Sequence, residues 1–197
     1  GNPLLDISAN VPESFLTKYD LRLNDAILAA DKHLPIYKEL SDSGAYPVDY
    51  IAGGATQNAI RICQWMMQTP NATAYIGSVG DDQFGAILAE KAKADGVAVH
   101  YHVERGVPTG TCAVLVHKHE RSLVANLAAA NCYKYEHLLR PEIESVWRQA
   151  KIIYIAGFFL TVSPPSIMHL ARFAADNGRL FAMNLAAPFI SEFFSAP

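Results

Sequence analysis

Hydrophobic and polar positions change their spacing several times along the chain, and these changes outline its elements. Short runs in which apolar residues alternate with polar ones, or follow one another directly, are typical of strands. We predict strands at 7–11, 48–51, 73–79 and 97–103. Segments with helical spacing and capping or turn residues at their ends predict helices at 12–19, 31–40, 57–67 and in the stretch that ends at Ala94.

The middle of the chain has the pattern of a hairpin. β-Rich sequence at 109–117 and 122–127 flanks a charged turn at 118–121. The elements predicted after it are a helix at 140–149, a strand at 152–155, a helix from Ser163 to about Asp176 and a strand at 180–185. Strand, helix and strand within this length form a βαβ unit, so we predict a parallel sheet here.

Two kinds of structure therefore alternate along the sequence. The second half is typical of a buried, parallel α/β arrangement. The first ~50 residues and the hairpin are instead typical of exposed β structure. A sheet interleaved in this way with an α/β body often covers a site as a lid.

Composition excludes several classes of function. The 197 residues are 51% hydrophobic and 18% charged, which allows a sizeable core. The net charge is -3, and the sequence contains no block of basic residues. Nucleic acids and anionic membrane surfaces are therefore not expected partners. No apolar run approaches the ~20 residues of a membrane-spanning helix. The three cysteines are widely spaced and lack metal-binding spacing, which indicates a reducing, cytosolic setting.

Both ends of the chain are abrupt. It opens on Gly1 without an initiator Met, and it stops at Pro197 just after an apolar segment. We therefore expect it to be part of a longer protein.

The most informative segment runs from Ala52 to Ile60. An extended apolar stretch there meets two glycines, Gly53 and Gly54, and a helix follows. Glycine lets a ligand approach the backbone closely, and the free N–H groups of the helix start can face that ligand. Asn58, in the first helical turn, could meet a hydroxyl with its amide. The alternative is an ordinary strand-to-helix turn.

Asp6 is predicted where a strand is ending, beside Asn2. Because one carboxylate can accept two O–H bonds, Asp6 suits the paired hydroxyls of a sugar, and the alternative is a turn aspartate. Phe158 and Phe159 follow a short strand, at the edge where ligands of α/β sheets bind. A planar heterocycle could stack there. The alternative is that both rings belong to the core, and we expect that at least one does.

Four other residues were weighed for chemistry. Arg121, at the predicted hairpin tip, could close over a substrate and meet phosphate charge, or it could be a solvated turn residue. Cys112 has no base nearby in sequence, so packing is expected. His117 and His119 share one strand face but lack further ligands, so no metal site is predicted. The chain has no GxxxxGK[ST] or GxSxG pattern and no convincing GxGxxG.

A family resemblance is carried by segments that span the chain in order. They are GNPLLD (1–6), AGGATQN (52–58), GSVGDDQFG (77–85), PTGTC (108–112), RSLVANLAAANCY (121–133), YIAGFFLTVSP (154–164) and NLAAPF (184–189). AGGATQN and GSVGDDQFG are similar to the general signature of the ribokinase-like (PfkB) carbohydrate kinases. GNPLLD, NLAAANCY and YIAGFFLTVSP resemble the adenosine kinases within that family.

The resemblance implies an α/β fold: a three-layer, ribokinase-like arrangement of a parallel sheet flanked by helices, with a small β-sheet lid. The lid would come mainly from about 6–53 and 108–128. The α/β body would come from about 54–107 and 129–197, and the C-terminal nucleotide-binding part would be missing.

The resemblance also implies a reaction, in which the γ-phosphoryl of ATP moves to the 5′-hydroxyl of adenosine with Mg²⁺, as in purine salvage. Asp6 would bind the ribose hydroxyls, helped by Asn58 and by the Gly54 backbone in the turn that begins at Gly53. Asn2 would contact the nucleoside. Further implied site residues are Phe158 (stacking on adenine), Arg121 (near the phosphates), and the pocket lining Leu4, Leu28, Cys112, Leu123, Ala125, Leu127 and Phe189. The family comparison favours a monomer in the cytoplasm, with the nucleus also open.

Departures from the family bear on these expectations. Ala26 and Ala55 stand where members often carry Gln and Ser, and alanine removes polar contacts to the base. The family's catalytic base is an Asp in a Gly-Ala-Gly-Asp motif that also holds the phosphates, and this motif does not occur here. We expect it beyond Pro197. The alternatives are a non-catalytic nucleoside-binding fragment, and a family kinase of another nucleoside or of a sugar.

Overall fold

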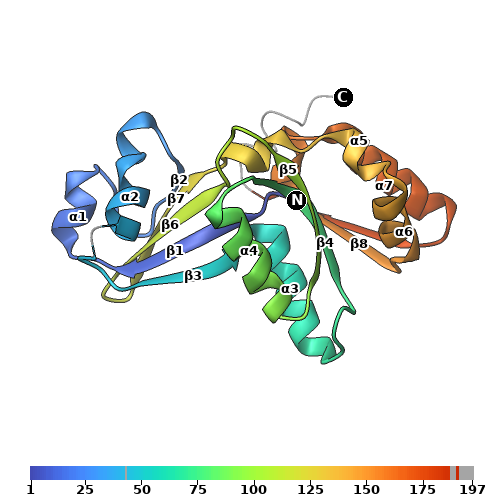
Figure 1. Cartoon of the computed structure of the whole chain (residues 1–197), viewed down its shortest axis with the longest axis horizontal. Coiled ribbons are helices and arrows are strands. Elements are labelled where there is room, and N and C mark those ends of the chain that lie inside the picture. The colour runs from blue at the N-terminus through green and yellow to red at the C-terminus, as the bar shows by residue number, and fades with distance from the viewer. Residues whose placement is uncertain (43, 187–189, 191–197) are drawn as a thin grey trace.

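The structure, a computed structural model, describes residues 1–42, 44–186 and 190. Its elements fall into two parts along the long axis of the molecule (Figure 1). One part is a five-stranded sheet with α1 (Glu13–Lys18) and α2 (Pro35–Asp42). The other part contains two parallel strand pairs and the remaining helices.

The five-stranded sheet is assembled from segments far apart in the sequence. Its strands are β1 (Leu4–Asn10), β2 (Ala26–Leu28), β3 (Val48–Gly53), β6 (Thr111–His117) and β7 (Glu120–Asn126). Their order is β2-β7-β6-β1-β3. β1 is parallel to β6 and antiparallel to β3, while β6 and β7 form the predicted hairpin. The sheet is therefore mixed.

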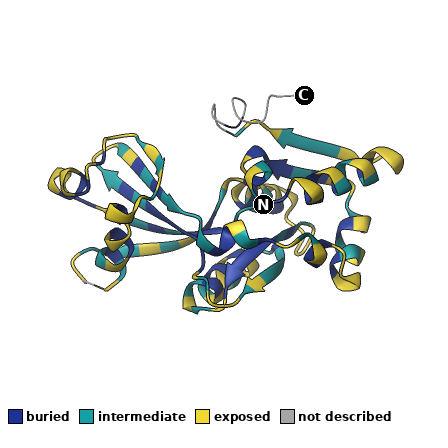
Figure 2. Cartoon of the chain, turned by 90° about the horizontal axis from the view of Figure 1, so that it is seen from above, coloured by how far each residue is buried: buried dark blue, intermediate teal, exposed yellow. Residues whose placement is uncertain are grey.

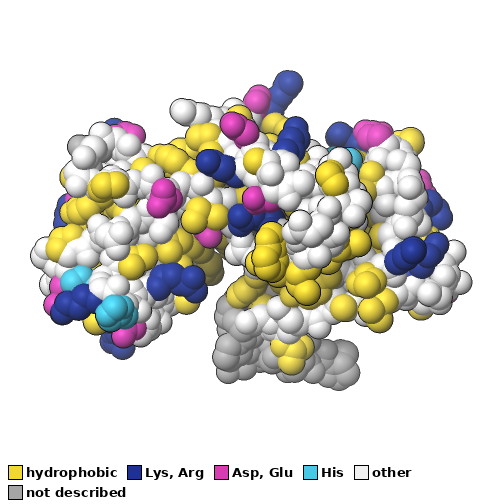
Figure 3. Space-filling view, turned by 90° about the horizontal axis from the view of Figure 1, so that it is seen from below, with side chains coloured by type: hydrophobic (Ala, Val, Ile, Leu, Met, Phe, Trp, Pro, Cys, Tyr) yellow, Lys and Arg dark blue, Asp and Glu magenta, His cyan; other side chains and the backbone are white. Residues whose placement is uncertain are grey.

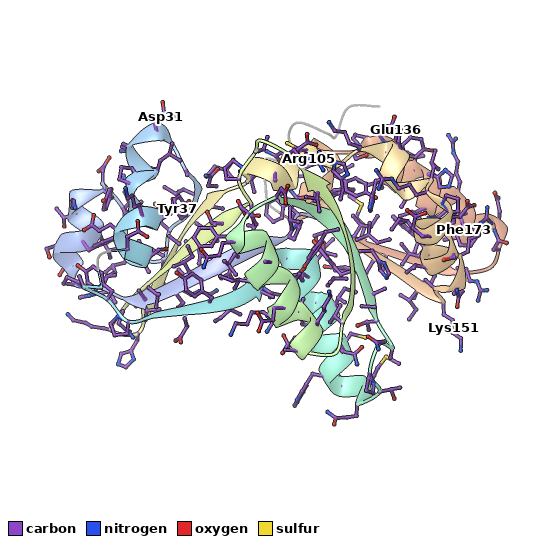
Figure 4. The ribbon with its side chains drawn as sticks, viewed as in Figure 1. Asp31, Tyr37, Arg105, Glu136, Lys151 and Phe173 are labelled. Atoms are coloured by element: carbon purple, nitrogen blue, oxygen red, sulfur yellow. The ribbon has the colours of Figure 1, made fainter. Side chains whose placement is uncertain are left out.

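One face of this sheet, the sealed face, is covered by α1 and α2. Its buried side chains are Ile7, Ala9, Ala113, Leu115 and Val124 from the strands, with Phe15, Leu16, Ile36 and Leu40 from the helices. Tyr37 reaches from α2 to the sheet, where its hydroxyl donates to the Val124 carbonyl at 2.9 Å (Figure 4). Each fully buried Leu or Ile here contributes about 1.5–3 kcal/mol. The expectation of exposed β structure is wrong for this face, because the two short helices cover it.

The second part confirms the predicted parallel α/β arrangement. β4 (Ala74–Gly80) pairs in parallel with β5 (Ala98–Glu104), and α4 (Gln83–Ala94) connects them. β8 (Ile152–Ala156) pairs in parallel with β9 (Leu180–Asn184) through α7 (Pro164–Asp176). The other helices here are α3 (Ala55–Met67), α5 (Tyr135–Leu138) and α6 (Pro141–Gln149). Their core includes Leu138, Ile143, Trp147, Ile155, Phe159, Ile167 and Leu170.

Several local predictions need correction. Asp6 is the third residue of a seven-residue strand and not at a strand end, because pairing with β3 and β6 extends β1 back to Leu4. Arg121 is the second residue of β7, and the hairpin turn lies at Lys118 and His119. The 3₁₀ turns at Ala128–Cys132 and Gly157–Thr161 were not predicted. Such short turns depend on tertiary packing more than on local pattern.

A compact hydrogen-bonded junction connects the two parts. The Asp82 carboxylate accepts from the Thr109 amide at 2.7 Å, from the Thr109 hydroxyl at 2.6 Å and from the Gly85 amide at 2.8 Å. A Cβ added at Gly80 would lie 2.4 Å from the Val107 carbonyl oxygen, so the end of β4 and the segment before β6 can approach this closely only with glycine there. Figure 2, seen from above, shows buried residues running through the strands into this middle region. The junction therefore fixes where the sheet leaves the α/β part.

Candidate functional site

Side chains alternate along each strand, so the face opposite the sealed face carries a different set of residues. The strand register places Asp6 between Ile51 and Cys112, Cys112 opposite Ala125, and Ala125 opposite Leu28. The same alternation puts Leu4, Gly53, Arg121 and Leu123 on this side. We call it the open face. It brings together eight candidates named from the sequence: Leu4, Asp6, Leu28, Gly53, Cys112, Arg121, Leu123 and Ala125.

Seen from below, the molecule is hollowed between the sheet part at the left and the α/β part (Figure 3). Hydrophobic side chains gather along the walls of this hollow. The sequence could show the residue types of the open face. Only the pairing of strands 100 residues apart shows that they share one surface.

An apolar cluster occupies one end of the open face. Leu4, Cys112 and Ala130 are buried there, and Val114, Leu123, Ala125 and Leu127 pack against them half-buried. A Cβ at Gly110 would lie 2.7 Å from Leu4 Cδ2, so glycine lets this cluster close up. Five of the seven residues expected to line a pocket thus meet in one cluster. The sixth, Leu28, is exposed on β2, and Phe189 lies outside the described residues.

The Cys112 thiol belongs to this apolar cluster chemically as well. Burial raises the pKa of Cys112 to about 12, and the neighbouring Asp6 carboxylate adds to the rise. A thiol with such a pKa is neutral at physiological pH and is a poor nucleophile. The packing role expected for Cys112 fits this environment.

Asp6 is the charged group of the open face. Its carboxylate lies over Gly53, where a Cβ would be 2.2 Å from Asp6 Oδ1, so any side chain at position 53 would displace the carboxylate. Burial raises the pKa of Asp6 to about 6, and the positive charges of Arg61 and Arg121 partly oppose this rise. No described residue donates a hydrogen bond to this carboxylate. A partly buried carboxylate without donors is suited to receive them from a ligand.

The two glycines at the start of α3 are explained by different contacts. Gly54 has φ of 95°, and a Cβ there would lie 2.3 Å from the Asn2 carbonyl oxygen. The buried Gln57 side chain holds the turn, since it donates to the Gly53 carbonyl at 3.2 Å and accepts from the Tyr101 hydroxyl at 2.6 Å. Gln57 was not singled out from the sequence, although it belongs to the AGGATQN segment.

Asn58 is exposed in the first turn of α3, near the end of β3 that carries Gly53. Its Oδ1 accepts a hydrogen bond from Arg61 Nη1 at 3.2 Å. Arg61 was missed in the sequence, although its position three residues after Asn58 on a helix places both side chains on one face. The Asn58 amide nitrogen remains available as a donor.

Asn2 adds a further polar atom. Its Oδ1 is buried and has no hydrogen-bond partner among the described residues. Buried polar atoms in native proteins are nearly always paired, so an unpaired one beside the Gly54 turn is a candidate ligand contact.

Phe158 lies in the 3₁₀ turn that follows β8, at the carboxyl end of the strand as expected, and its ring is 36% exposed. Phe159 is buried, which confirms that one of the two rings is core. The turn is fixed by Asn184, whose Oδ1 accepts from the Gly157 amide at 3.0 Å.

Arg121 is exposed, and its charge acts on Asp6 from two strands away.

Metal and membrane features were also sought. Within residues 1–42, 44–186 and 190, no group of three or more His, Cys, Asp or Glu side chains is arranged to hold a metal ion. No helix in the described part of the chain has the length and apolar character needed to cross a bilayer.

Comparisons with known proteins show which family the chain resembles. Residues 13–196 match the pfkB family of carbohydrate kinases. Adenosine kinase 2 of Arabidopsis thaliana is 59% identical over 194 residues, which cover 98% of this chain and 56% of that protein. The chain therefore spans about half the length of the curated relatives it matches.

Two solved structures extend the comparison. Adenosine kinase of Anopheles gambiae, in complex with P1,P4-di(adenosine-5) tetraphosphate, has a TM-score of 0.89 and 48% identity, covering 99% of this chain and 58% of that one. Adenosine kinase of Schistosoma mansoni, in complex with adenosine in an occluded loop conformation, has a TM-score of 0.90 and 35% identity, covering 99% and 56%. These likenesses confirm the expected ribokinase-like fold.

Proposed function

The chain belongs to the pfkB family of carbohydrate kinases, and from this premise we propose that it provides the nucleoside-binding half of an adenosine kinase. In the whole protein, the γ-phosphoryl of ATP would move to the 5′-hydroxyl of adenosine, giving AMP and ADP. The observation that carries the proposal is the Asp6 carboxylate, which lies over Gly53 without a donor beside an apolar cluster.

The chemistry of that face matches a nucleoside in two respects. The ribose offers two adjacent hydroxyls, and the two Asp6 oxygens can accept one hydrogen bond from each. The Asn58 amide can add a third polar contact from α3. The base, an apolar plate with polar edges, suits the cluster of Leu4, Cys112 and Leu123, with Phe158 and Asn2 as further contacts.

Arg121 is assigned to the transferring phosphates. It lies on the open face with Asp6 and is exposed. A guanidinium on a mobile sheet can neutralise charge that develops on a phosphoryl group. The sheet would act as the lid, with the junction at Asp82 at its base.

The donor half of the site would come from chain that follows Pro197 in the whole protein. α3 supports this view, because it buries polar residues (Thr56, Gln57 and Gln64) and exposes apolar ones. Ile62, Trp65 and Met66 are 59%, 67% and 71% exposed. A helix surface of this kind is normally covered by further protein.

Within the described residues, no group of three or more His, Cys, Asp or Glu side chains is arranged to hold a metal ion, and the sequence has no Gly-Ala-Gly-Asp motif. We therefore assign Mg²⁺, ATP and the catalytic base to the remainder of the whole protein. A cytoplasmic monomer, with the nucleus as a further location, is the setting we propose.

The test is turnover by full-length protein, meaning this chain with the C-terminal part that its relatives possess. With ATP and Mg²⁺, we expect phosphorylation of adenosine and none of free ribose, because ribose leaves the apolar cluster unfilled. The 197-residue chain alone should show no turnover. Phosphorylation of ribose in preference to adenosine would support a sugar kinase, and absence of any turnover by full-length protein would support a non-catalytic binding protein.

A further inference from the structure

Arg61 is the group that the proposed function leaves unused, yet it lies directly behind the open face. It sits on α3 one turn after Asn58, and 24% of its side chain is exposed. Its guanidinium donates to three acceptors on three elements. These are Asp95 Oδ2 at 2.5 Å, Asn58 Oδ1 at 3.2 Å and the Ala52 carbonyl oxygen. A long side chain loses entropy when it is held in one geometry, so three simultaneous hydrogen bonds indicate a defined position for this guanidinium.

We propose that Arg61 is a positioning residue of the ribose site, which turns the Asn58 amide nitrogen toward the sugar and holds a positive charge behind the Asp6 carboxylate. The inference rests on the proposed function. It adds a residue that touches no substrate atom but decides how the diol is recognised.

The hydrogen bond from Arg61 fixes the orientation of the Asn58 amide. A guanidinium has only donors, so the atom of Asn58 that faces Arg61 must be the oxygen. The NH₂ group is then directed away from Arg61 and presents donors to the site. Without Arg61, the Asn58 amide can turn either its oxygen or its nitrogen toward the site with nearly equal energy. The nitrogen would then donate to a ribose hydroxyl oxygen for only part of the time.

Charged and titratable groups from three elements surround the Asp6 carboxylate. The groups that face it are Arg61 from α3, Arg121 from β7 and the neutral Cys112 thiol from β6. β3 contributes Ile51 opposite Asp6, with Gly53 opposite Leu4 on one side of it and Asp49 opposite Ser8 on the other. Arg61 is thus the cation held in place by two other acceptors, whereas Arg121 is exposed on the sheet.

The Asp95 carboxylate makes this arrangement rigid. It follows α4 and accepts from Arg61 Nε, whereas Asn58 accepts from Nη1. Ala52, which accepts from Nη1, immediately precedes Gly53. Arg61 therefore connects the end of β3, the start of α3 and the end of α4.

The experiment compares Arg61→Gln and Arg61→Lys with wild-type full-length protein, using adenosine, 2′-deoxyadenosine and 3′-deoxyadenosine. For Arg61→Gln we expect the preference for adenosine over the deoxynucleosides to fall roughly tenfold, the size of one hydrogen bond. KM for adenosine should rise while KM for ATP stays unchanged. The pH below which kcat/KM for adenosine falls should rise by up to about one unit, because loss of the cation raises the pKa of Asp6.

Arg61→Lys keeps the charge but not the forked geometry. Its kcat/KM for adenosine should therefore depend on pH as in the wild type, while its preference for adenosine over the deoxynucleosides stays reduced. Arg172→Gln on α7 is the matched control, since it removes an exposed arginine outside the site and should change neither quantity.

Unchanged hydroxyl preference and an unchanged pH dependence of kcat/KM in Arg61→Gln would overturn the inference. If Arg61→Gln does not fold, undiminished hydroxyl preference in Arg61→Lys overturns it instead. Failure of wild-type protein to use adenosine at all would count against the proposed function, which is a separate result read from the wild type alone.

Discussion

The junction at Asp82 and the open face at Asp6 both centre on a partly buried aspartate, yet they treat it in opposite ways. Burial alone would raise the pKa of Asp82, but hydrogen bonds from Thr109 and from the Gly85 and Phe84 amides hold it below its usual value. Asp6 has no such donors, and burial raises its pKa to about 6. The satisfied carboxylate stabilises the fold, whereas the unsatisfied one costs stability and is free for a ligand.

The largest expected effect comes from removing the unsatisfied carboxylate. Asp6→Ala in full-length protein should lower kcat/KM for adenosine by about 10²–10⁴-fold, since two charge-assisted hydrogen bonds contribute roughly 1.5–3 kcal/mol each. Steady-state kinetics with adenosine check this, with the variant's melting curve as the control for folding. Adenosine kinetics equal to wild type would show that Asp6 does not bind the ribose.

Removing the satisfied carboxylate should act on stability. Asp82→Ala leaves the buried Thr109 amide and the Gly85 amide without their acceptor, so we expect a loss of about 3 kcal/mol in the free energy of unfolding. Because the pKa of Asp82 is lowered in the folded state, its contribution is present above the unfolded-state pKa and is lost as pH falls through the folded-state value. Urea titrations should therefore show the wild type and the variant converging in acid. A gap that persists there would mean that the carboxylate charge is not what holds the junction.

Neutralising Asp6 should increase the stability of the protein, the reverse of the change expected for Asp82→Ala. The folded-state pKa of about 6 exceeds the unfolded-state value of 3.8. Wild-type stability should thus fall as pH rises between these values, and above pH 6 the ionised carboxylate should cost about 2–3 kcal/mol. Asp6→Asn should be more stable than wild type by that amount at pH 8 and equal to it below about pH 4, while losing activity. Thermal melts at the two pH values measure this, and a variant less stable than wild type at pH 8 would contradict it.

The smallest expected effect concerns whether the base of adenosine binds beside β2. Ala26 is exposed on the open face, opposite Leu123. Ala26→Gln would add an amide on the open face, so KM for adenosine should fall about threefold with kcat unchanged, the modest gain of one exposed hydrogen bond. Leu23→Gln, an exposed leucine three residues earlier outside β2, is the control. Equal KM values in both variants would place the base away from β2.

Much of the architecture was predictable from local pattern. The hairpin at 109–127, the parallel βαβ unit at 152–185 and the Gly53-Gly54 turn before a helix all agree with the structure. The sealed face was not predictable, because the helix pattern at 31–40 does not say which sheet the helix covers. Arg61 was missed for a similar reason, since two of its three acceptors come from other elements.

The sequence by itself determined the element types, the glycine turn and the chemistry on offer, because side-chain period, turn residues and motif composition are local properties. Only the tertiary structure decided that Asp6 lies over Gly53, that Leu4 and Cys112 meet in one apolar cluster, and that one aspartate is satisfied while the other is not. The contacts of Asp6 and Leu4 depend on the register of β1 with β3 and β6, which lie about 50 and 100 residues further along the chain. A shift of one residue in that register would turn Asp6 from the open face to the sealed face.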